Sequence, residues 1–87
     1  MTRYFFNFYT QSDECLDPEG LELPDAGALA TAVLNAARDM IAADAMAGRI
    51  DLHCRIEAVN EAQDIIHSLS FADAVTFVAP LPTRLAA

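Results

Sequence analysis

The chain has 87 residues, of which 54% are hydrophobic, and its formal net charge is −8 at pH 7. A composition this hydrophobic excludes intrinsic disorder, and the length suits one domain with a small core. The 13 acidic residues outnumber the five arginines, and because such a balance repels phosphate groups, we expect no nucleic acid among the partners.

Cysteine usage and hydropathy indicate a compartment. Cys15 and Cys54 lie far apart and form no CxxC motif. The N-terminus lacks the apolar stretch of about 7 to 15 residues that a secretory signal needs, and no run approaches the roughly 20 apolar residues of a membrane span. We therefore expect a cytoplasmic, reduced protein that does not bind a membrane.

Residues 3–9, RYFFNFY, contain five of the seven aromatic residues and no Gly or Pro, which is typical of a half-buried strand. Alternate side chains of a strand point to opposite faces. One face therefore carries Tyr4, Phe6 and Phe8, and the other carries Arg3, Phe5, Asn7 and Tyr9. One set can be buried under a helix, but both cannot.

The next segments predict a loose hairpin and a long helix. Turn formers fill residues 10–20, TQSDECLDPEG, and GLEL at 20–23 alternates before Pro24, which predicts a short second strand. The helix spans about residues 26–47, with Asp25 as N-cap and Gly48 at its end. Ten of its 22 residues are alanine, and its apolar face carries Leu29, Val33, Ala36, Ala37, Met40 and Ala43.

A second hairpin follows. Residues 51–59, DLHCRIEAV, alternate as a half-buried strand, and IIHSL at 65–69 is the return strand. A three-residue loop, 61–63, would place Glu57 opposite His67 and Arg55 opposite Leu69. Ser70 then caps a short turn, SFAD, and residues 79–87 are predicted to be a flexible C-terminal tail.

These elements predict an α+β fold of order ββαββ, in which one long helix packs on one face of a four-stranded antiparallel sheet, within a single domain of residues 1–78. The face without the helix would carry an apolar patch, and such patches mark interfaces. We predict that this patch is an interface with an apolar centre and a polar rim. The centre is formed by Phe5, Tyr9, Val59, Ile65 and Leu69, and the rim by Arg3, Arg55 and His67.

Three segments together resemble a family of short bacterial proteins, frequent in alphaproteobacteria, that is known only as a domain of unknown function. They are RYFF at 3–6, DPEGLELPD at 17–25 and SLSFADAV at 68–75, and the resemblance covers about residues 2–77. The chain departs from that family at Asn7, where histidine is common, and at Gln63, where glycine is usual. The resemblance implies a compact stand-alone domain and brings no activity, cofactor or catalytic residue.

The motifs for metal binding and catalysis are incomplete or absent in the sequence. The soft ligands are Cys15, His53, Cys54 and His67, and adjacent strand residues such as His53 and Cys54 cannot easily share an ion. An acidic loop with Asp13, Glu14, Asp17 and Glu19 before Gly20 is an incomplete version of a calcium loop. Because the chain has no nucleophile elbow and no glycine-rich loop, we expect no enzyme and no cofactor.

The predicted function is therefore non-catalytic association, with a second copy as a homodimer or with another protein, through the open sheet face or an edge strand. The alternative is a regulatory protein that responds to a metal or small ligand through the acidic loop 13–19 and the histidines. An aromatic RNA platform is disfavoured, since only Arg3 and Arg55 would lie near the rings.

Overall fold

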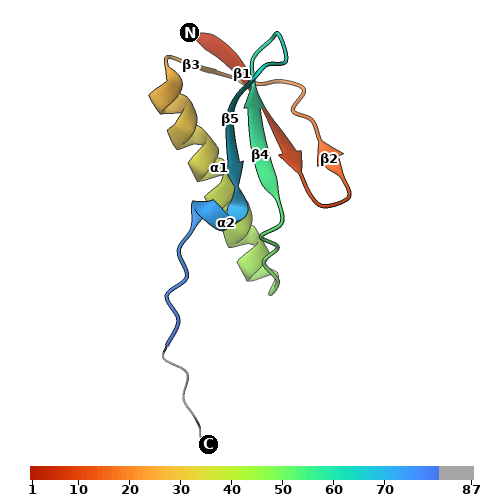
Figure 1. Cartoon of the computed structure of the whole chain (residues 1–87), viewed down its shortest axis with the longest axis vertical. Helices are drawn as coiled ribbons and strands as arrows, with labels where there is room; N and C mark the ends of the chain where they lie inside the picture. The colour runs from red at the N-terminus through yellow and green to blue at the C-terminus, as the bar shows by residue number, and fades with distance from the viewer. Residues whose placement is uncertain (81–87) are drawn as a thin grey trace, which may run out of the picture.

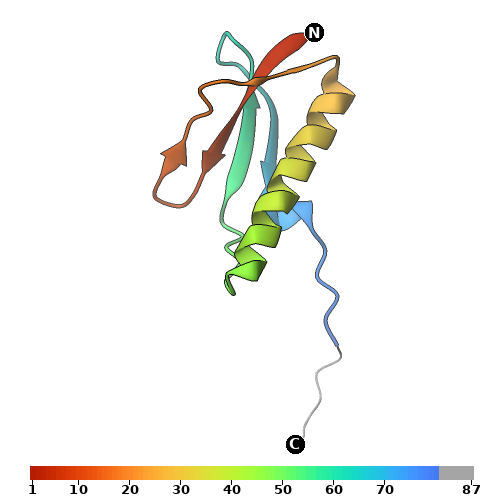
Figure 2. The same ribbon diagram turned by 180° about the vertical axis from the view of Figure 1, so that it is seen from behind.

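The computed structural model describes residues 1–80. Five strands form one antiparallel sheet, and a long helix lies along one of its faces (Figures 1 and 2). The elements in chain order are β1 (Thr2–Tyr9), β2 (Glu14–Cys15), β3 (Leu21–Leu23), α1 (Ala26–Met46), β4 (Arg55–Val59), β5 (Ile65–Ser70) and α2 (Phe71–Ala74). The predicted α+β class with one long helix is confirmed. The predicted flexible tail, 79–87, lies almost entirely outside the described residues.

The predicted count of four strands is wrong because the strand beside β1 is divided into two pieces. β3 pairs with the start of β1, and β2 pairs with its end, so that Thr2 lies opposite Leu23 and Phe8 opposite Cys15. Between them the Asp17 carboxylate accepts a hydrogen bond from the Phe6 N–H at 3.1 Å, in place of a strand partner. The segment predicted as a plain loop thus contains the short strand β2.

The long helix begins and ends where its capping residues predict. The Asp25 side chain accepts a hydrogen bond from the Ala28 N–H at 2.8 Å, and Gly48 follows the last turn with φ 89°. The many alanines favour the helix intrinsically and let it lie close to the sheet. Its buried side chains, which form the core with Tyr4, Ile56, Ala58 and Phe71, are Leu29, Val33, Ala37 and Ile41.

The strand predicted from residue 51 begins only at Arg55. The Asp51 carboxylate accepts a hydrogen bond from the His53 N–H at 2.9 Å and holds residues 51–53 in a turn. The predicted start was therefore wrong, although Cys54 packs in the core.

The second hairpin has the predicted three-residue loop but a different register. The Asn60 N–H donates to the Asp64 carbonyl at 3.1 Å, which closes a loop of residues 61–63. A β-bulge then shifts the pairing, so that Val59 lies opposite Ile65 whereas Ala58 lies opposite His67.

The shift makes both predicted cross-strand pairs wrong. Glu57 lies opposite Ser68 instead of His67, and Arg55 lies opposite Ser70 instead of Leu69. A slip of one residue moves every following side chain to the other face of the sheet.

The loop of this hairpin offers a test of backbone strain at Gln63, which has φ 70°. Side chains other than glycine are disfavoured in this left-handed region, so we expect Gln63→Gly to stabilise the domain by about 1 kcal/mol. The measurement is the free energy of unfolding in urea. Gln63→Ala retains the Cβ and should bring no such gain; equal stabilisation by both variants would place the effect in the lost side chain instead.

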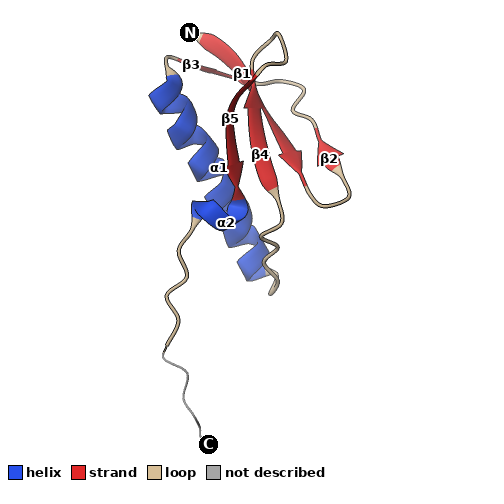
Figure 3. Cartoon of the chain, in the orientation of Figure 1, coloured by secondary structure: helices blue, strands red, loops and turns tan. Residues whose placement is uncertain are grey.

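The chain leaves the sheet through α2. The Ser70 hydroxyl accepts a hydrogen bond from the Ala72 N–H at 3.3 Å, which confirms the predicted cap. The Arg38 Nε donates to the Ala74 carbonyl at 2.8 Å and fastens α2 to α1. Residues 75–80 form neither helix nor strand and run away from the sheet (Figure 3).

Candidate protein interaction surface

The sheet face opposite α1, called here the open face, brings four of the predicted interface residues together. Cross-strand pairing places Phe5 opposite Val59 and Tyr9 opposite Arg55, and Val59 lies opposite Ile65 on its other side. Phe5, Tyr9, Val59 and Ile65 therefore share this face, as predicted. Tyr4, Phe6 and Phe8 lie on the helix side.

Two predicted interface residues lie on the opposite face. Leu69 is opposite the buried Ile56 and packs against the core, and His67 is opposite the buried Ala58. Their predicted placement was wrong because the bulge could not be foreseen. The predicted pairing of His67 with Glu57 is therefore absent.

The open face is partly covered by residues 16–20. The Asp17 N–H donates to the Asn7 Oδ1 at 3.0 Å, and Asn7 is only 6% exposed. Gly20 lies so close to β1 that an added Cβ would be 2.9 Å from Cε1 of Phe5. A small pocket of about 160 Å³ remains, lined by Phe5, Asn7, Leu16, Asp17, Val59 and Gln63.

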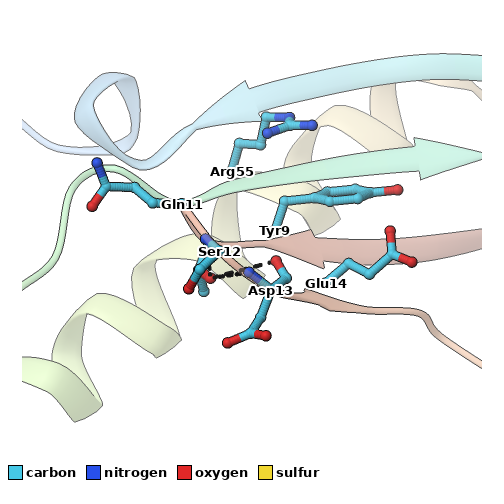
Figure 4. A pocket seen from close by; sticks show the side chains of 7 residues that line it. Tyr9, Gln11, Ser12, Asp13, Glu14 and Arg55 are labelled. Atoms are coloured by element: carbon cyan, nitrogen blue, oxygen red, sulfur yellow. Dashed lines mark hydrogen bonds between the residues drawn. The ribbon is translucent and has the colours of Figure 1, made fainter.

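The two arginines predicted at the rim are engaged within the domain. The Arg3 Nη2 lies 2.8 Å from the Glu22 Oε2, and its Nη1 donates to the Glu19 carbonyl at 2.6 Å, which fastens β3 and its loop to β1. The Arg55 guanidinium lies 4.4 Å from the centre of the Tyr9 ring, and its Nε donates to the Glu57 Oε2 at 3.0 Å. Figure 4 shows Arg55 above the Tyr9 ring.

A shallow hollow of about 540 Å³ adjoins Tyr9 and Arg55 at the β1–β2 turn (Figure 4). The Thr10 hydroxyl accepts hydrogen bonds from the N–H groups of Ser12 and Asp13 and shapes this turn. The hollow is lined by Tyr9, Thr10, Gln11, Ser12, Asp13, Glu14 and Arg55. Because its arginine is already paired with Glu57, the hollow offers mainly carboxylates and neutral polar groups.

The exposed apolar side chains near this face lie mainly on β5 and on residues 16–20, called here the covering loop. Ile65 is 59% exposed and Ile66 is 45% exposed, and Leu16 is also exposed. Sequence reasoning missed Ile66, since strict alternation placed it on the helix side, and it missed Leu16, whose only signal was an isolated leucine among turn formers. Within residues 1–80, β5 pairs with β4 alone, so its outer edge has no strand partner.

The candidate ligands for metals are dispersed or occupied. Both Asp17 oxygens accept backbone N–H groups, Oδ1 from Glu19 and Gly20 and Oδ2 from Phe6. Burial, followed by the charges of Asp51 and Asp44, raises the pKa of the Cys54 thiol. Across residues 1–80 no three His, Cys, Asp or Glu side chains lie close enough to hold an ion. The regulatory alternative stays a prediction that none of these contacts supports.

None of the helices within residues 1–80 combines the length and apolar character that spanning a bilayer requires. That includes α1, the longest of them, whose sequence contains Arg38, Asp39 and Asp44.

Comparison with known proteins gives one match. A family model described as "Domain of unknown function (DUF6894)" matches residues 3–72. Neither the curated proteins nor the solved structures contain a match to this chain. The matched region includes nearly all of the sheet and the whole of α1, and it ends within α2, so residues 73–80 lie beyond it.

Proposed function

The chain belongs to the DUF6894 family, a domain of unknown function, and we propose that it is a non-catalytic association module that binds a second copy of itself at the β5 edge and the adjoining open face. Strand addition at a free edge supplies affinity through backbone hydrogen bonds. The exposed isoleucines beside the edge add apolar contact.

The observation that carries the proposal is the unprotected β5 edge. Natural proteins block free edges with charged residues, prolines or cover. The sequence of β5, IIHSLS, contains no Asp, Glu, Lys, Arg or Pro, and Ile65 and Ile66 are exposed next to it. The bulge lies at the start of β5, and within residues 1–80 no strand pairs with the outer edge of β5.

The test is the solution mass by light scattering across a dilution series at neutral pH. We expect the full chain to form a dimer that dissociates on dilution. Ile66→Lys places a charge beside the edge and should raise the dissociation constant at least about tenfold, since an unpaired charge in an apolar contact costs more than about 1.4 kcal/mol. Far-ultraviolet circular dichroism checks that this variant is folded.

The matched control is Met46→Lys, which adds the same charge at an exposed position at the end of α1. It should dimerise as the unmodified chain does. A full chain that stays monomeric at every concentration would contradict the proposal, and so would an Ile66→Lys variant with unchanged affinity.

A further inference from the structure

The segment of residues 75–80, VTFVAP, is extended and has exposed apolar side chains. Val75 already has strand dihedrals, φ −140° and ψ 159°. Phe77 is 64% exposed and Val78 is 92% exposed. β-Branched and aromatic residues of this kind favour strands, yet the segment has no strand partner within residues 1–80. It also lies beyond the region that the family model matches.

The segment is long enough to pair along most of the β5 edge. β5 has six residues and the stretch before Pro80, 75–79, has five, so they extend over about 20 Å and about 17 Å at the usual rise of a strand. Pro80 has no N–H to donate and would end a ladder at Ala79.

The distribution of charge favours contact between two copies of the chain along β5 and the segment 75–80. Each copy has a net charge of −8, so two copies repel each other over most of their surfaces. From Ile65 to Pro80 the only charged residue is Asp73. Two copies can therefore meet along β5 and the segment 75–80 without bringing many carboxylates together.

The segment is directed away from the β5 strand of its own chain. Phe71 and Ala74 of α2 are each 1% exposed, and the Arg38 Nε holds the Ala74 carbonyl at 2.8 Å. Both opposite views show the described part of the segment running away from the sheet (Figures 1 and 2). Pairing with its own β5 would require this anchored turn to be released.

We infer that residues 75–79 of one copy add as a strand to the β5 edge of a second copy. The exchange is reciprocal, so that a symmetric dimer contains two such junctions and each sheet gains one strand. This inference rests on the proposed self-association and names the segment that binds the edge. The added strand also gives Phe77 and Val78 apolar neighbours, since Ile65 and Ile66 lie beside the same edge.

The test uses the full chain with Thr76→Pro and Phe77→Pro together. Adjacent residues of a strand donate in opposite directions, so this pair removes an N–H directed at β5 in either register. We expect the dissociation constant to rise at least about 100-fold, because both junctions of the dimer are lost and each is worth about tenfold or more. The control, Thr76→Ala with Phe77→Leu, retains both N–H groups and should still dimerise.

Mixing experiments then identify the junction itself. The double-proline variant has an intact β5 edge, and Ile66→Lys has an intact segment, so each variant alone forms only damaged junctions. Their mixture restores one complete junction and should contain a heterodimer, detected by light scattering at concentrations at which each variant alone is monomeric.

The outcomes separate the two proposals. A double-proline variant that dimerises like the unmodified chain overturns the inference and leaves the proposed self-association standing. A mixture that remains monomeric overturns it in the same way. A full chain that is monomeric throughout removes the proposed function and this inference together.

Discussion

Gly20→Ala is expected to destabilise the domain by about 3 kcal/mol. Gly20 has φ +75°, and an added Cβ would lie 2.8 Å from the Tyr4 carbonyl oxygen and 2.9 Å from the Phe5 Cε1. The left-handed conformation costs roughly 1 to 2 kcal/mol for alanine, and forcing an atom into a filled space costs typically about 1 to 3 kcal/mol more. The Tyr4 carbonyl belongs to β1 and cannot retreat without disturbing the sheet. Urea unfolding at neutral pH measures the loss.

Gly48→Ala is the matched control for this prediction. Gly48 has φ +89° but no atom within 4 Å of the position that a Cβ would occupy. Its replacement should therefore cost only the conformational part, about 1 kcal/mol. If the two variants lost equal stability, the close approach of Gly20 to β1 would contribute nothing, and residues 16–20 would not be seated against the sheet.

Local signals explain which parts of the fold the sequence could predict. Asp25 and Gly48 mark the ends of α1 because a cap and a left-handed glycine act within a few residues of their own positions. The loop 61–63 was also correct, since the Asn60 side chain accepts hydrogen bonds from the Ala62 and Asp64 N–H groups and fixes the turn locally. Such features need no knowledge of distant contacts.

The errors arise where contacts with elements distant in the sequence determine the local structure. β2 has two residues, too few to show an alternating pattern, and it exists because β1 lies beside it. The bulge is equally hidden: either Ile65 or Ile66 could begin the alternation of β5, and only packing against β4 and α1 selects one. Leu69 and His67 were misplaced for this reason, and Ile66 was overlooked.

The aromatic residues of β1 illustrate how this changes the view of function. They suggested an exposed aromatic face, yet Phe6 and Phe8 pack against the core, Phe5 lies beneath Gly20, and Tyr9 lies beneath Arg55. Most of the surface of these rings thus makes contacts within the domain. The surface left for a partner moves from β1, in the interior of the sheet, to the free edge of β5.

Asp17→Asn is expected to destabilise the domain by about 2 kcal/mol at neutral pH. The carboxylate accepts three backbone N–H groups, from Phe6, Glu19 and Gly20, each at 3.1 Å. The NH₂ group of asparagine cannot accept, so at least one of these bonds is lost, and hydrogen bonds to a charged group contribute roughly 1.5 to 3 kcal/mol. Urea unfolding of both proteins gives the difference.

The pH dependence of this difference tests its origin. Burial raises the pKa of Asp17, but the N–H groups of Phe6, Gly20 and Glu19 and the charge of Arg3 lower it more, so the pKa in the folded state is below the ordinary 3.8. A lowered pKa means that the stabilisation is complete above the pKa of the unfolded chain, about 4, and is lost as the pH falls through the folded value. The advantage over asparagine should therefore be constant near neutrality and shrink below about pH 4.

Asp39→Asn controls for the loss of one negative charge, since Asp39 is exposed on α1. Its effect on stability at neutral pH should stay within about 0.5 kcal/mol. The difference in the free energy of unfolding between the unmodified chain and Asp17→Asn could instead persist unchanged down to about pH 2.5. In that case the negative charge of the carboxylate would not be the source of the stabilisation. The covering loop would then depend on the shape of the side chain at position 17, and the acid sensitivity of the domain would have to come from other carboxylates.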